Sequence, residues 1–91
     1  MEYRFYKDPD TGMAHCRNHG VTELEAISVV QSPGRLFRNQ DESLVAEGQT
    51  LSGRYIRVVY REDSQDDSIF VITAYDMGGK AKRAYRRRKG K

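Results

Sequence analysis

The segment RNHGVTELEA, residues 17 to 26, places an arginine, a histidine and a glycine directly before an expected helix. His19 could act as a general acid or base, because an unperturbed imidazole titrates near neutral pH. Arg17, Arg57 and Arg83 could stabilise charge on phosphoryl oxygens, since the guanidinium fork matches phosphate geometry. These side chains suit one reaction that needs no metal, the attack of an RNA 2′-hydroxyl on its neighbouring phosphate. The candidate catalytic residues are therefore His19, Arg57 and Arg83.

Other chemistries lack their motifs. His15 and His19 are four residues apart, but no third ligand follows at a spacing typical of zinc, so we expect no metal. The chain has no G-x-S-x-G or G-x-x-x-x-G-K motif, and we expect no serine nucleophile, no nucleotide hydrolysis and no cofactor. Cys16 is the only cysteine, which excludes an intrachain disulfide. For His19 a structural interpretation also stays open, in which its ring packs or caps locally at the helix entry.

The formal net charge of +3 conceals an uneven distribution. Residues 80 to 91, KAKRAYRRRKGK, hold eight of the 16 basic side chains and no acidic one, so residues 1 to 79 carry eight basic against 13 acidic side chains, a net charge of −5. Such a segment can bind a polyanion through phosphate contacts and counterion release, or it can be a solvated, partly disordered end. The candidate nucleic-acid-binding residues are Arg17, Tyr55, Arg61, Lys82, Arg86, Arg87 and Arg88.

Length and composition predict a single domain over residues 1 to 91, with the basic segment 80 to 91 at its end. The hydrophobic share of 37% and the charged share of 32% are typical of a folded chain. The longest apolar run, Ile69 to Tyr75, is too short to span a membrane, and the N-terminus lacks a signal-peptide core. We therefore expect a cytoplasmic protein without membrane association.

The sequence predicts one strand, one helix and then a meander. Alternating aromatics in EYRFYK, residues 2 to 7, predict the first strand. Thr22 and Glu25 fit a capping box at the start of a helix over residues 22 to 31. Four strands follow at residues 35–39, 44–51, 54–61 and 68–75, with a two-residue turn at Ser52 and Gly53 and a basic helical segment from about Lys80.

These elements predict an α+β domain, a small antiparallel sheet of four to five strands packed against one or two helices. Alternation in the 54–61 strand places Ile56, Val58 and Tyr60 on one face and Tyr55, Arg57 and Arg61 on the other. The second face is either a platform for RNA or an ordinary solvated surface. The expected core comprises Leu24, Ile27, Val30, Ile56, Val58, Phe70 and Ile72.

The segment RNHGVTELEAISVVQSP resembles the K-H-G-V-[ST]-x-x-E-A segment of the BrnT-type ribonuclease toxins. GQTLSGRYIRVVYRED and SIFVITAYDMGGKAKRAYRRR follow at a spacing similar to that of the family's G…R-x-L-x-V-V-Y and I-R-I-I-S-A-R blocks. The resemblance implies a RelE-like fold, RNA cleavage without a metal and an adjacent antitoxin as partner. In two departures, Tyr75 stands where the family has an arginine, and Asp8-Pro9 only partly echoes its aspartate-rich first strand. VITAY is closer to an uncharacterised sister family of the same fold.

Two hypotheses follow for the function. The first is an RNA-directed domain that acts as a metal-independent endoribonuclease toxin of a toxin–antitoxin pair. The second is a non-catalytic module that uses the basic segment to bind RNA or an acidic protein. Tyr75, at the position of the family's arginine, favours the second hypothesis, whereas a neighbouring reading frame for a short antitoxin would favour the first.

Overall fold

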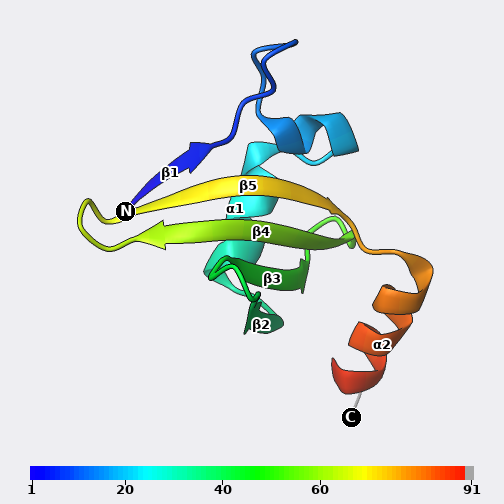
Figure 1. The fold of residues 1–91 in the computed structure, drawn as a ribbon. Helices are drawn as coiled ribbons and strands as arrows, with labels where there is room; N and C mark the ends of the chain where they lie inside the picture. Colours follow the sequence, from blue (N-terminus) through cyan, green and yellow to red (C-terminus); the bar gives the residue numbers. More distant parts are fainter. Residues whose placement is uncertain (90–91) are drawn as a thin grey trace.

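A five-stranded sheet forms the centre of the molecule, with the two longest strands in its middle (Figure 1). The computed structural model describes residues 1 to 89, so the last two residues of the predicted basic segment lie outside the described residues. No helix in this described part is long and apolar enough to cross a membrane. The elements are β1 (Glu2–Phe5), the 3-10 helix η1 (His15–His19), α1 (Glu23–Gln31), β2 (Arg35–Arg38), β3 (Leu44–Gln49), β4 (Tyr55–Asp63), β5 (Ser68–Asp76) and α2 (Gly79–Lys89).

The strand order is β1-β5-β4-β3-β2, and the predicted α+β class is confirmed. The expected antiparallel meander is present from β2 to β5. The sheet is nevertheless mixed, because β1 pairs in parallel with β5 at the opposite edge. Alternating aromatics predicted the strand correctly, but they carry no information about its partner.

Helix α1 begins as the capping box predicts. The backbone N–H of Glu25 donates to Thr22 Oγ1 at 3.1 Å, and the Thr22 N–H donates to Glu25 Oε1 at 3.0 Å. The predicted buried stripe is wrong in part: Leu24 is 78% exposed, and the fully buried positions are Ala26 and Val29. A small residue at position 26 and Gly48 on β3 let the helix approach closely, since a Cβ at Gly48 would lie 3.2 Å from Val29 Cγ1.

Ile56 and Val58 are completely buried under α1, as predicted. On β5 the expected core residues Phe70 and Ile72 are only half-buried, and Ile69, Val71 and Ala74 fill the core instead. A bulge explains the change, because Val59 pairs with Thr73 while Tyr60 pairs with Val71, leaving Ile72 without a partner. An extra residue breaks the period of two on which the prediction depended.

One connection differs slightly from the sequence prediction. The turn between β3 and β4 is a three-residue loop, because the Thr50 N–H donates to the Arg54 carbonyl at 2.8 Å and Gly53 adopts a φ of +94°. Helix α2 begins at Gly79, close to the predicted Lys80. It lies beyond the end of β5, whereas α1 lies behind the sheet (Figure 1). It is docked through Tyr85, which is 7% exposed and lies edge-on to Tyr55 at 5.8 Å between ring centroids.

Candidate nucleic-acid interface

Four side chains form a row across the face of the sheet opposite α1. Arg35, Glu47, Arg57 and Tyr75 are direct partners on β2, β3, β4 and β5, and cross-strand partners project from the same face. We call these four residues the cross-strand row. Glu47 is 1% exposed and accepts hydrogen bonds from Arg57 Nε at 2.8 Å, from Arg57 Nη2 and from Arg35 Nη1 at 3.2 Å. The buried carboxylate therefore fixes both guanidinium groups.

Arg57 is consequently a positioned cation and not a free one. Burial alone would lower the pKa of Arg57, but hydrogen bonds to the Glu47 carboxylate and then to the Tyr75 hydroxyl raise it above its ordinary value. Its charge is thus permanent, and it is partly balanced by a carboxylate that two arginines share. A phosphate oxygen beside the row would meet a guanidinium that already has a defined orientation.

A hollow of about 610 Å³ separates the cross-strand row from α2. We call it the α2 hollow. Its cations come from both sides, Arg35 and Arg57 from the sheet and Lys80 and Arg88 from the helix, while the small side chains of α2 leave room between them. The residues lining it are Arg35, Glu47, Arg57, Gly78, Gly79, Lys80, Ala81, Ala84 and Arg88. Its cations suit an anionic group such as a phosphate.

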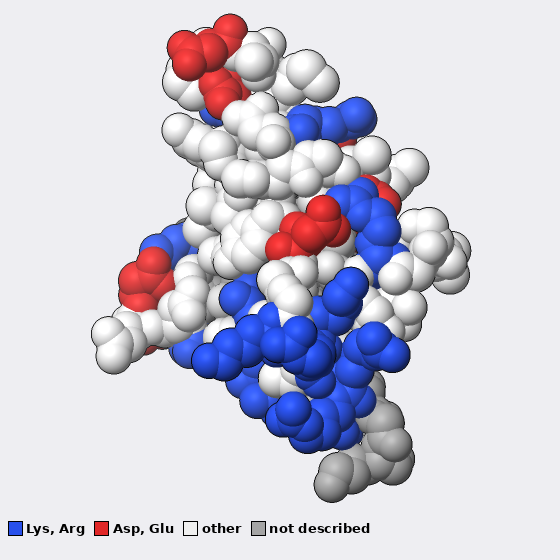
Figure 2. All heavy atoms as spheres, turned by 90° about the vertical axis from the view of Figure 1, so that its right-hand side faces the viewer, with Lys and Arg blue, Asp and Glu red and all other residues white. Residues whose placement is uncertain are grey.

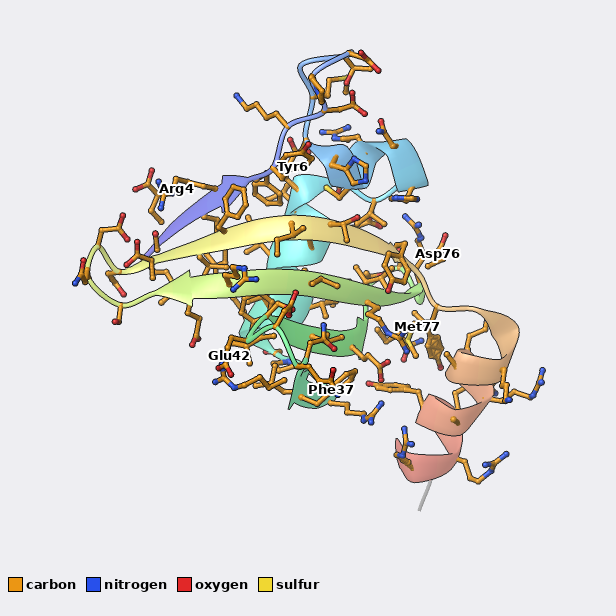
Figure 3. All side chains as sticks on the ribbon, viewed as in Figure 1. Arg4, Tyr6, Phe37, Glu42, Asp76 and Met77 are labelled. Atoms are coloured by element: carbon orange, nitrogen blue, oxygen red, sulfur yellow. The ribbon has the colours of Figure 1, made fainter. Side chains whose placement is uncertain are left out.

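His19 lies at the opposite end of the cross-strand row from α2. Its ring is 5.3 Å from that of His15 and 6.0 Å from that of Tyr75, and the ring of Tyr6 is 5.8 Å from that of His15. We call Tyr6, His15, His19 and Tyr75 the ring series; Figure 3 shows Tyr6 beside η1. Tyr75 therefore lies between His19 and Arg57, and His19 does not line the α2 hollow.

Arg54 fixes the segment that carries His19. Its Nη1 donates to the Gly20 carbonyl at 2.8 Å and to Glu25 Oε1 at 3.0 Å, and its Nη2 donates to Asp76 Oδ1 at 2.9 Å. The Asp76 carboxylate raises the pKa of Arg54, and the backbone N–H of Thr22, followed by Arg54, lowers the pKa of Glu25. One side chain thus ties the end of η1 and the start of α1 to the end of β5.

The cations predicted to bind nucleic acid fall into two groups. Those outside α2 have acidic partners: Arg17 Nε is 2.6 Å from Glu23 Oε1, and Arg61 Nη2 is 3.6 Å from Asp41 Oδ2. Those on α2 form no ion pair with any residue in the range 1 to 89, although Lys82 Nζ lies 5.5 Å from the Tyr55 ring centroid. The cations of α2 with described side chains, called here the α2 cations, are Lys80, Lys82, Arg83, Arg86, Arg87 and Arg88.

Figure 2 shows the result, a continuous patch of Lys and Arg over α2. Arg83 belongs to this exposed patch, and it does not line the α2 hollow with Arg57. The three predicted catalytic residues are therefore not gathered at one point: Arg57 lies in the row, His19 lies beyond Tyr75 and Arg83 lies on the helix. What the structure does gather is a set of cations around the α2 hollow and, at the other end of the cross-strand row, a set of aromatic rings.

Sequence reasoning missed Glu47, Arg35 and Arg54. Glu47 had an available signal, since it and Arg57 lie five residues on either side of Ser52 and a hairpin centred there pairs them. Arg35 then follows from the next pairing. Arg54 had no such signal, because Gly20, Glu25 and Asp76 are distant in sequence and meet only in the fold.

No protein-family model matches this chain, and no curated protein is significantly similar to it. Within residues 1 to 89 no cluster of three or more histidine, cysteine or acidic side chains could hold a metal ion. The side chains gathered at the cross-strand row, the α2 hollow and the ring series are mainly cationic and aromatic. Guanidinium and ammonium groups bind phosphates, and aromatic rings bind the faces of bases.

Proposed function

We propose that this protein binds RNA through α2 and the adjoining cross-strand row. The single observation that carries the proposal is that the α2 cations have no acidic partner among the described residues, although residues 1 to 79 contain 13 acidic side chains. Unpaired cations on one surface attract a polyanion and release its counterions. The resemblance of residues 17 to 33 to a segment of ribonuclease toxins supports RNA as that polyanion.

The docking of α2 supports binding at a defined place over a merely solubilising end. Burial, followed by the nearby Tyr55 and Glu47, raises the pKa of Tyr85, which is consistent with a ring enclosed against the sheet. Gly34 leaves room for this ring, because a Cβ at position 34 would overlap the Tyr85 hydroxyl and force it to shift. The anchored helix holds Lys80 and Arg88 at the edge of the α2 hollow, opposite Arg57.

The test compares two sets of three arginines. Arg83, Arg86 and Arg87 are replaced together by glutamine, and in a matched control the exposed but paired Arg4, Arg38 and Arg61 are replaced likewise. Binding of a labelled RNA is measured by fluorescence anisotropy over a series of salt concentrations. If each α2 cation neutralises one phosphate, the first triple variant should bind about 100-fold more weakly near about 0.1 M salt, with a slope of log affinity against log salt reduced by about 2.

The control should bind RNA with nearly the affinity of the wild type, because its arginines are already neutralised by Asp66, Glu42 and Asp41. Equal losses in the two triple variants would mean that net charge alone drives the binding. An α2 variant that binds like the wild type would overturn the proposal.

A second candidate, the metal-independent endoribonuclease with an antitoxin partner, is favoured by one contact. His19 is 6.0 Å from Tyr75 between ring centroids, and Tyr75 contacts Arg57, so a proton carrier and a cation flank one tyrosine. If His19 transfers a proton during cleavage, His19→Ala should slow cleavage in excess chelator by about 100-fold or more. Thr22→Ala is the control, because losing the cap should cost about 1 kcal/mol of stability and no activity. Absence of wild-type cleavage, with binding intact, would reject this candidate.

A further inference from the structure

The ring series is an exposed aromatic surface next to the cationic one. Tyr6 is 45% exposed, His19 is exposed, and His15 and Tyr75 are half-buried. Successive rings meet at 59°, 75° and 70°, so no ring of the series lies flat on the next. None of the four belongs to the buried core cluster under α1. Packing of the core therefore does not account for their position.

We propose that the ring series is a base-stacking site, and hence that the RNA this protein binds is single-stranded. The inference rests on the proposed function and specifies its substrate class. Every base has a π-face, so stacking on tyrosine and histidine tolerates any sequence. Base pairs inside a duplex already stack on their neighbours, so a duplex would offer this surface phosphates, sugars and base edges but no base face.

The position of the ring series gives a path for the strand. Tyr75 is both its last ring and the first member of the cross-strand row, where it contacts Arg57. Beyond Arg57 lie Glu47, Arg35 and the α2 hollow. A single strand can therefore place bases on the ring series while its phosphates continue past the row toward the α2 cations.

The experiment separates stacking from charge. Tyr6→Ala and His19→Ala are combined, leaving Tyr75 intact because of its contact with Arg57. The matched control combines Leu36→Ala and Leu51→Ala, which remove exposed apolar side chains elsewhere, and a thermal melt checks the fold of each variant. Probes are an oligouridine strand and an RNA duplex of equal length. Loss of stacking should weaken binding of the single strand about 10-fold or more at fixed salt, leaving its salt slope unchanged.

Wild type should prefer the single strand, and the control should match wild type. His19→Phe with Tyr6→Phe should retain the binding, because phenylalanine stacks but cannot transfer a proton. Three outcomes would overturn the inference: equal wild-type affinity for strand and duplex, an unaffected double alanine variant, or equal loss on both probes. If replacing Arg83, Arg86 and Arg87 still weakens RNA binding when one of these outcomes is found, the proposed function stands and only the base-stacking site is rejected. Wild type that binds neither probe would overturn both.

Discussion

The arginines of residues 1 to 78, called here the body, and the cations of α2 differ in their partners, not in their chemistry. Each body arginine lies within ion-pair distance of a carboxylate, whereas no α2 cation does so among the described residues. The body arginines are Arg4, Arg17, Arg35, Arg38, Arg54, Arg57 and Arg61. A paired arginine is already neutralised by its carboxylate, whereas an unpaired one can neutralise a phosphate and so release counterions from the nucleic acid. Position in a charge network, and not residue type, therefore marks the candidate binding surface.

The body pairs are themselves unequal. Those of Arg4, Arg38 and Arg61 lie at the surface, where water and salt leave an ion pair worth about 0 to 1 kcal/mol. Glu47 differs, since its carboxylate is enclosed and two guanidinium groups depend on it. Removing the charge of Glu47 would therefore leave two body arginines without an acidic partner among the described residues, as the α2 cations are.

The largest effect is expected from Glu47→Gln, which leaves Arg35 and Arg57 without their counter-charge. The free energy of unfolding should fall by about 3 kcal/mol, the lower end for a broken buried pair, because both arginines keep partial access to water. In the folded fraction, two released cations should steepen the salt slope of RNA binding by about 1. Urea denaturation and salt-dependent anisotropy measure the two quantities.

Glu42→Gln is the control, because Glu42 is 76% exposed and pairs with an exposed Arg38. Its expected cost is below about 0.5 kcal/mol, and its RNA binding should not change. Equal destabilisation by the two substitutions would show that the burial of Glu47 carries no special weight.

An intermediate effect is expected from Gly34→Ala, which tests whether one aromatic contact docks α2. The added Cβ would overlap the Tyr85 hydroxyl, so the ring must shift and the docking of the helix should weaken. We expect a loss of about 1 kcal/mol, since the core under α1 is untouched. The many Lys and Arg residues of a more weakly docked α2 should then be cut faster by trypsin, as limited proteolysis would show.

Gly78→Ala is the matched glycine substitution. A Cβ at this position meets nothing within 4 Å, so both the docking and the proteolysis rate should be unchanged. If the two alanine variants are cut at the same rate, the contact between Tyr85 and Gly34 does not hold the helix.

Much of this fold could be predicted from local patterns. The Thr22 and Glu25 capping box, the meander and the helical segment near Lys80 all depend on neighbours in sequence. The errors came from tertiary events that leave no local trace. The bulge at Ile72 shifted the buried face of β5, the close approach of α1 at Gly48 buries Val29 while Leu24 stays exposed, and β1 pairs with a strand from the second half of the chain.

The candidate site was less predictable than the fold. Arg57 and the cations of α2 were singled out from residue type and charge alone, but residue type cannot say which cations are neutralised. Arg17 and Arg61 carry the same charge as Arg83, yet Glu23 and Asp41 lie beside them. The grouping of Tyr6, His15, His19 and Tyr75 depends on β1 meeting β5, a contact that the sequence pattern leaves open.

The smallest effect is expected from acid, and it should act on one region only. Four carboxyl groups of the body have pKa values below their ordinary range. Hydrogen bonds from backbone N–H groups are the main cause for Asp8 and Glu25. Side-chain hydrogen bonds are the main cause for the other two, from Arg17 to Glu23 and from Ser43 to Asp41. A carboxyl group whose pKa is lower in the folded than in the unfolded protein stabilises the fold at any pH above the unfolded pKa. That contribution is lost as the pH falls through the folded pKa. Thermal unfolding should therefore show the body weakening from about pH 5 to about pH 3.

Glu25→Gln should lower the melting temperature at neutral pH, and so narrow the difference between the melting temperatures at neutral and acid pH. The corresponding loss of unfolding free energy should be less than about 1 kcal/mol. Glu62→Gln is the control, because Glu62 is exposed and forms no ion pair with any residue from 1 to 89. Helix α2 contains no carboxylate, so mild acid leaves its charge unchanged. The salt slope of RNA binding should also be the same for Glu25→Gln as for the wild type at neutral pH, because the substitution leaves the α2 cations unchanged. A slope that changed along with body stability would mean that paired arginines outside the cross-strand row contribute to binding, and the contrast between the two regions would fail.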